Sequence, residues 1–156
     1  MLRSTTILLP GLLVLAACSG SSNPQKDAFV ALNSREYSAA VGYFDQALEG
    51  LDETDNKYLD LVLGKCEALA ATDADGAKAL FLATTATHEL VFRDYNVLVS
   101  RLATAKAFDQ AIDILAHGKD AFPSEEAKLK QMAESIKTLI KGNPAALERL
   151  RGLGYL

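Results

Sequence analysis

The sequence predicts an all-α fold, on three observations. Alanine, leucine, lysine, glutamate and aspartate dominate beyond the first two dozen residues, and such a composition favours helices. The chain has only four prolines. It also lacks the long alternation of valine, isoleucine and threonine that would indicate strands. With 156 residues, 49% of them hydrophobic, the chain is long enough for one globular domain with a modest core.

Helix start and stop residues predict the elements in order. Asn23 can cap a first helix that has Pro24 at its first position, and Gly50 can end the second. Pro123 stops the sixth helix, and Ser124 can cap a long seventh. We expect helices over residues 24–33, 35–49, 57–71, 76–86, 94–104, 108–122 and 124–142, and a short one that starts at residues 143–144.

One spacing of aromatic and alanine residues occurs more than once. Tyr37 is followed by Ala40 three residues later, by Phe44 four further, and by Ala47 three after that. Phe108, Ala111 and Leu115 repeat the scheme, and Ala74, Ala77 and Phe81 keep the same spacing between the two copies. The three marker alanines, Ala40, Ala77 and Ala111, lie about one repeat length apart.

This spacing resembles the tetratricopeptide repeat, in which two helices form a hairpin and an alanine fits where they cross. The third copy is the most complete, because Tyr95, Leu98 and Leu102 match the first helix and Pro123 closes the repeat. The first copy matches in its second helix only, and the middle copy lacks the turn glycine. The resemblance covers residues 24–123 and implies a helical-hairpin solenoid of about three repeats.

The residues after Pro123 predict a cap for this stack. One face of the seventh helix is an apolar stripe with helical period, formed by Leu129, Met132, Ala133, Ile136, Leu139 and Ile140. Its other face is charged, which suits a capping helix over residues 124–142. Residues 143–156 form a short helix and an apolar tail, which either folds back onto the cap or docks elsewhere.

The N-terminus has the organisation of a secretory signal. Arg3 precedes an apolar run over residues 7–15, which is too short to span a bilayer. Leu15, Ala16, Ala17 and Cys18 then resemble a bacterial lipobox. That resemblance implies that residues 1–17 are removed and that Cys18 carries a covalent lipid. Residues 18–23 become the lipidated cysteine and a short tether.

The expected anchor places the protein in the bacterial cell envelope. Two or three acyl chains give lasting membrane attachment, whereas a single chain is marginal. Ser19 stands where lipoproteins of the inner membrane often have aspartate, so the resemblance implies the outer membrane, facing the periplasm. With Cys18 lipidated, Cys66 has no partner for a disulfide within the chain. We expect a buried free thiol, with a reactive cysteine as the alternative.

Charge argues against nucleic acid as a partner. The net charge is −4, and phosphates are repelled by an acidic surface. The acidic residues concentrate in the first half, with 11 acidic and 3 basic residues over 27–75, against 4 and 6 over 124–156. This imbalance indicates either ordinary solvated helix faces or an acidic end that selects a basic partner.

No motif indicates catalysis, a metal or a cofactor other than the lipid. His88-Glu89 is not followed by the second histidine of a helical zinc site. Asp73 and Asp75 resemble the start of a calcium loop, but the later ligands are absent. We therefore expect a protein that is not an enzyme.

The repeat resemblance implies instead that the first helices of successive repeats line a concave groove. It places Leu59, Val62, Cys66 and Leu69 there in the middle repeat, and Arg93, Asn96, Ser100 and Thr104 in the third. The alternative is that residues 59–69 are simply core between neighbouring helices.

The predicted function is that of a membrane-anchored adaptor or scaffold, which binds another protein of the cell envelope. The alternative is a self-associating structural subunit or a spacer without a dedicated groove.

Overall fold

A computed structural model describes residues 23–156, and over that range the chain contains eight α-helices, one short 3-10 helix and no strand. The all-α prediction is therefore confirmed. The predicted signal over 1–17, Cys18 and the tether up to residue 22 lie outside the described residues. Within residues 23–156, none of the helices combines the length and the apolar character needed to span a membrane.

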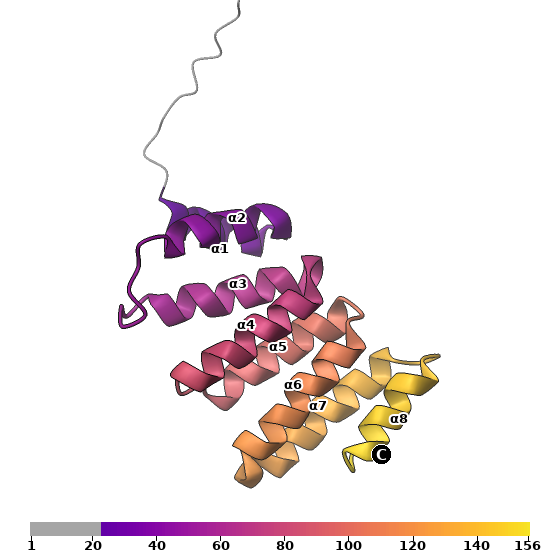
Figure 1. Ribbon diagram of the computed structural model, residues 1–156. Helices are drawn as coiled ribbons and strands as arrows, with labels where there is room; N and C mark the ends of the chain where they lie inside the picture. The colour runs from indigo at the N-terminus through magenta and orange to yellow at the C-terminus, as the bar shows by residue number, and fades with distance from the viewer. Residues whose placement is uncertain (1–22) are drawn as a thin grey trace, which may run out of the picture.

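The helices follow one another as a stack of antiparallel neighbours, from α1 and α2 at one end to α8 at the other (Figure 1). Each expected helix is present, and most boundaries agree within two residues. The elements are α1 Pro24–Asn33, α2 Tyr37–Leu48, α3 Tyr58–Thr72, α4 Ala74–Thr87, α5 Phe92–Thr104, α6 Phe108–Ala121, η1 Pro123–Glu125, α7 Glu126–Leu139 and α8 Pro144–Gly152.

Two helix starts differ from the prediction because of side-chain caps. The Asp73 Oδ1 atom accepts a hydrogen bond from the Gly76 amide at 3.0 Å, so α4 begins at Ala74 instead of Gly76. A Cβ at Gly76 would lie within 3 Å of that carboxylate, so the close approach needs glycine. At α5, the Asp94 carboxylate accepts from the Val91 amide at 3.0 Å, and the helix begins at Phe92.

The predicted helix over 124–142 is shorter than expected. Residues Pro123–Glu125 form the 3-10 turn η1, so Ser124 does not cap α7, which begins at Glu126. The helix ends at Leu139, and Gly142 then adopts a positive φ of 91°. Glycine adopts this left-handed conformation readily, and it turns the chain toward α8.

Two of the turns between helices have the same backbone conformation. Arg35, between α1 and α2, has a φ of 63°, and Lys106, between α5 and α6, has a φ of 64°. After each of them, a backbone amide reaches five residues back: Glu36 N–H to the Ala31 carbonyl and Ala107 N–H to the Leu102 carbonyl, both at 2.9 Å. This is the Schellman arrangement of a helix end, here with no glycine at its left-handed residue.

The helices pack in two layers. The odd-numbered helices α1, α3, α5 and α7 contact one another in that order, and α4, α6 and α8 do the same. The marker alanines Ala40, Ala77 and Ala111 are all 0% exposed, as their spacing predicts. The core has two parts. A small cluster joins α1, α2 and one side of α3, and a larger cluster extends from α3 to the C-terminus.

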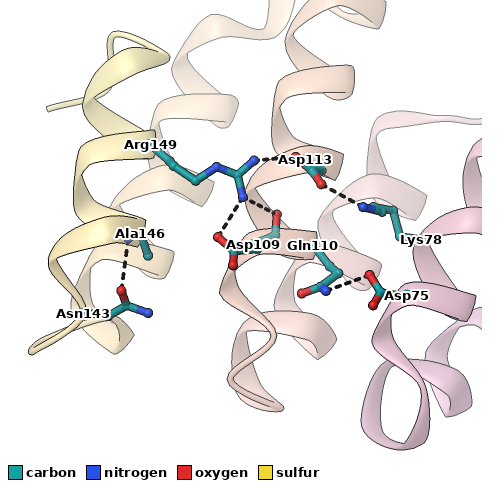
Figure 2. Close-up of polar contacts among 8 residues, drawn as sticks. All are labelled: Asp75, Lys78, Asp109, Gln110, Asp113, Asn143, Ala146 and Arg149. Atoms are coloured by element: carbon teal, nitrogen blue, oxygen red, sulfur yellow. Dashed lines mark hydrogen bonds and ion pairs between the residues drawn. The ribbon is translucent and has the colours of Figure 1, made fainter.

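Several polar contacts between the helices and their loops join residues about 35 positions apart, whereas Asp45–Lys65, Tyr95–His117 and Asp109–Arg149 are 20, 22 and 40 apart. In Figure 2, Lys78 of α4 binds Asp113 of α6 at 2.9 Å, and Gln110 binds Asp75 at 2.9 Å. Both pairs are separated by 35 residues. Other pairs with separations of 34–36 residues are Glu53–His88, Glu67–Arg101, Asp113–Arg149 and Lys119–Leu153.

The C-terminal tail lies against the last helices. Tyr155 is buried, and Lys119 of α6 lies over its ring at 5.6 Å from the centroid. The Lys119 Nζ atom also donates a hydrogen bond to the Leu153 carbonyl at 2.8 Å. Of the two possibilities considered for the tail, the structure therefore places it folded back on the end of the stack.

Candidate binding groove

The layer of odd-numbered helices carries two larger hollows, besides a small one of about 160 Å³ near Tyr37, Ala71 and Ala105. The first hollow lies between α1, α3 and α5 and has a volume of about 380 Å³. Its lining combines apolar and charged side chains: Phe29 of α1, Asp60, Leu63, Gly64, Cys66 and Glu67 of α3, Phe81 of α4, and Arg93, Asp94, Val97 and Leu98 of α5.

The part of the first hollow nearest α1 depends on Gly64. The rings of Phe29 and Phe44 meet edge to face there, with centroids 5.1 Å apart. A Cβ on Gly64 would lie 2.5 Å from the Phe44 ring and 3.1 Å from the Phe29 ring. The absence of a side chain at Gly64 thus allows both rings to pack directly on α3. Phe29 remains 37% exposed, so its ring presents an apolar surface to the hollow.

Charged side chains surround this apolar surface. Glu67 accepts a hydrogen bond from Arg101 Nε at 3.0 Å, and Asp94 lies 3.6 Å from Arg93 while it caps α5. Asp60 is exposed and has no ion pair or side-chain hydrogen bond within residues 23–156. One carboxylate of the first hollow is thus available to a ligand without the loss of an existing contact.

The second hollow lies between α5 and α7. It has a polar part of about 480 Å³ and a smaller, more apolar part of about 110 Å³, which share Asn96, Ser100, Met132 and Ser135. Asn96 and Ser100 are four residues apart on α5, as Gln131 and Ser135 are on α7, so each pair lies on one helix face. These amides and hydroxyls both donate and accept hydrogen bonds, which suits the backbone of a bound segment.

The structure divides the predicted groove residues among three places. Arg93 and Cys66 line the first hollow, and Asn96, Ser100 and Thr104 line the second. Val62 is 2% exposed and belongs to the core, against which Leu59 and Leu69 also pack. The structure thus agrees with the alternative interpretation for these three residues of α3.

Sequence reasoning missed three of the side chains that α3 gives to the first hollow. They are Asp60, Leu63 and Glu67, on the stripe next to the predicted one. Adjacent residues differ by about 100° around a helix, so an offset of one residue exchanges the groove face for the core face. The acidic residues at both ends of this stripe were an available signal, because isolated carboxylates are rarely buried.

Cys66 forms part of the hollow but is almost wholly buried, at 1% exposure, and is not in a disulfide. Burial raises the pKa of its thiol to about 12. The thiol is therefore protonated at neutral pH, and a protonated thiol is a poor nucleophile and metal ligand.

The two histidines lie in different parts of the fold, and each contacts a tyrosine. The His117 Nδ1 atom is 3.0 Å from the Tyr95 hydroxyl in the core between α5 and α6. His88 stacks on Tyr58, with ring centroids 5.7 Å apart, and joins two loops. Over the described part of the chain, no three histidine, cysteine, aspartate or glutamate side chains are grouped as metal ligands would be.

Compared with protein-family models, curated proteins and solved structures, the chain shows no match. Function is therefore inferred from the sequence and from the residues of the two hollows.

Proposed function

We propose that residues 24–123 form a tetratricopeptide-like solenoid of about three helical hairpins, with α7 as its capping helix. Two periodicities support this. Several polar contacts between helices join residues 34–36 positions apart, about one repeat, and the left-handed residues Arg35 and Lys106 are 71 residues apart. The marker alanines Ala40 and Ala111 are also 71 residues apart. A regular solenoid makes its contacts one repeat ahead in this way.

We further propose that this solenoid is an adaptor that binds another protein of the cell envelope and is not an enzyme. One observation carries the proposal: both hollows lie on the same helix layer, and they adjoin across α5. Arg93 and Val97 face the first hollow, whereas Asn96 and Ser100 face the second. A segment of a partner that crosses α5 would contact apolar, charged and hydrogen-bonding groups in turn.

Cys18 would hold this groove close to a membrane, in our proposal the outer membrane on its periplasmic side. Pro24, where α1 begins, is six positions after Cys18, and six extended residues reach about 20 Å. Phe29, which lines the first hollow, lies only five residues further on. Replacing Cys18 with alanine should leave an unprocessed or misplaced protein. Normal processing and wild-type membrane attachment of that variant would contradict the lipid anchor.

Site-specific photocrosslinking tests the adaptor role in intact cells. A benzophenone amino acid at Arg93 or Asn96 would report what lies over the first and second hollows, because both positions are exposed. The control position is Ala79, which is exposed on α4 and lines neither hollow. We expect one discrete partner band from the groove positions and none from Ala79. The same bands from all three positions would contradict a groove-specific partner.

Self-association is a second candidate, and one observation favours it. The first hairpin holds three of the six exposed large apolar side chains of residues 23–156, with Val30 at 54% and both Phe29 and Tyr43 at 37%, and clustered exposed apolar side chains are typical of interaction surfaces. In the crosslinking experiment, a product with twice the mass of the chain would support this candidate over an adaptor. Sedimentation of the purified lipoprotein in detergent would then show a stable dimer.

A further inference from the structure

We propose that the first hollow selects a peptide segment that has one apolar side chain flanked by lysine or arginine. This inference rests on the proposed adaptor function and adds the chemistry of the partner. Two properties of the site support this inference. One is an apolar surface that a single side chain can cover, and the other is a rim of carboxylates whose charge is only partly compensated.

The apolar surface is the anchor site. Phe29, Leu63 and Val97 come from three different helices and are each partly accessible, above the buried side chains of Phe81 and Leu98. A volume of about 380 Å³ accepts a leucine, methionine or phenylalanine side chain together with part of the segment that bears it. Burial of one such side chain is enough for a transient contact and too little for tight binding alone.

The charges at the rim favour cations next to that anchor. The hollow has three carboxylates, on Asp60, Glu67 and Asp94, and one guanidinium, on Arg93. Arg101 pairs with Glu67 at 3.0 Å and compensates its charge. Arg93 is 3.6 Å from Asp94, but its side chain is 80% exposed and can move away. Asp60 has no compensating partner within the described chain, so a cation there gains an ion pair without breaking another.

The surrounding loops extend this negative potential. The hollow extends along the first three turns of α3 and the first two of α5, so one end of it is close to the loops that precede these helices. Those loops contact each other, because His88 stacks on Tyr58 and its Nε2 atom lies 3.2 Å from the Glu53 carbonyl. Across both loops the only lysine is Lys57, whereas five acidic residues are exposed: Glu49, Asp52, Glu53, Asp55 and Glu89.

An acidic partner would meet repulsion from the same groups. Fields of like charge over a surface lower both the association rate and the affinity of a ligand, whereas opposite charge raises them. Dissolved ions screen such a field over about 8 Å at physiological ionic strength, so its strength depends on the salt concentration. Recognition by this hollow is therefore expected to weaken as salt increases.

Fluorescence anisotropy with three nine-residue peptides tests the proposal. The first has a central leucine with two lysines on each side, the second has glutamates in place of the lysines, and the third has glycine in place of the leucine. The lipidated protein is held in nanodiscs of neutral phosphatidylcholine, so that the lipid does not bind the cations. We expect the first peptide to bind at least about tenfold more tightly than either of the others. The glutamate peptide lacks the charge pairs, and the glycine peptide lacks the apolar anchor.

Matched variants locate the binding. Asp60→Lys reverses an exposed charge at the hollow, and Asp120→Lys makes the same change on α6, outside the lining of both hollows. Asp60→Lys should lower the affinity for the lysine–leucine peptide by about fivefold or more. Asp120→Lys should lower it by less than about twofold, since this change acts only at long range. Circular dichroism on both variants checks that the helices remain.

The outcomes separate this inference from the adaptor function. Equal or tighter binding of the glutamate peptide, or equal effects of the two variants, would overturn the cationic preference while a groove-specific crosslink still supports an adaptor. A crosslinked product that contains only this chain would mean that a second copy occupies the hollow, and would overturn the inference. No peptide binding together with no groove-specific crosslink would overturn both.

Discussion

The turn of the middle hairpin differs from the turns on either side of it. Between α1 and α2, and again between α5 and α6, the chain turns through a left-handed residue, Arg35 or Lys106. Between α3 and α4 a single residue, Asp73, ends one helix and starts the next, with a φ of −150°. The turns of the helical hairpins are therefore formed in two ways, either by a left-handed backbone residue or by a side-chain cap.

Glycine is absent from all three of these turns. The middle copy shares the lack of a turn glycine with the copies on either side of it. The outer turns accept a left-handed residue with a side chain, which costs roughly 1–2 kcal/mol relative to glycine's freedom. The middle turn avoids that cost and depends on one carboxylate. Packing of the hairpins, which is common to all three, must therefore determine the geometry.

The largest expected effect tests that shared packing. Ala77 and Ala111 are fully buried in the middle and third hairpins, and leucine at either position should destabilise the protein by about 1–3 kcal/mol or more. Alanine and leucine have similar helix propensities, so the loss would come from packing. Thermal unfolding followed by circular dichroism would measure it.

Ala116 provides the control, because it is only half-buried on the same helix as Ala111. Ala116→Leu should lower the free energy of unfolding clearly less than Ala111→Leu does. If Ala111→Leu and Ala77→Leu are no more harmful than this control, the hairpins do not cross at the marker alanines.

Removal of the cap in the middle turn should have the next largest effect. Asp73→Ala removes the hydrogen bond to the Gly76 amide and should destabilise the protein by about 1 kcal/mol. Urea unfolding would show a lower midpoint with an unchanged slope. Asp73→Asn is the matched control, because the asparagine oxygen can still accept from the Gly76 amide while the charge is lost. An equal loss in Asp73→Asn would assign the effect to the helix dipole and not to the cap.

Glycine at the outer turns should have a smaller effect of opposite sign. Lys106→Gly and Arg35→Gly relieve the left-handed conformation but increase the freedom of the unfolded chain, so a net gain on the order of 0.5 kcal/mol is expected. The urea midpoint should rise for both variants. A fall at both positions would show that the side chains of Arg35 and Lys106 stabilise the turns by contacts.

The smallest effect concerns the polar contacts that join the middle hairpin to the third and to α8. Burial raises the pKa of Asp113, but hydrogen bonds from Lys78 and Arg149 outweigh it, and the net pKa is lowered. Because the folded pKa lies below the unfolded one, this stabilisation is present above about pH 4 and is lost as the pH falls through the folded pKa.

Asp113→Asn should therefore reduce stability by a few tenths of a kcal/mol at pH 7, since the group is partly exposed. The difference from the wild type should shrink when urea unfolding is repeated below pH 4. A constant difference across this range would mean that the charge of Asp113 contributes nothing to the contact.

The helices were predictable from the sequence, and the groove side chains of α3 were not. Caps, prolines and the buried alanines act over a few residues, so they define α1 to α6 closely. The face of α3 that lines the groove is determined by which neighbouring helices cover its other faces. Val62 and Cys66 are buried because α4 and α5 lie over them, whereas Asp60 and Glu67 stay accessible. The sequence signal for the groove face was the pair of carboxylates on Asp60 and Glu67, whereas the apolar residues between them carry no local signal of which neighbour covers them.

The division of the core into two clusters gives the chain a directional response to force. The smaller cluster holds α1 and α2 on α3, and α1 is also the helix nearest the proposed anchor at Cys18. Tension between a membrane and a bound partner would enter through Pro24 and load this cluster first. Local opening would then separate Phe29 from Leu63 and Val97 before the larger cluster is disturbed. Native-state hydrogen exchange should accordingly show the amides of α1 and α2 opening at lower free energy than those of α5 and α6.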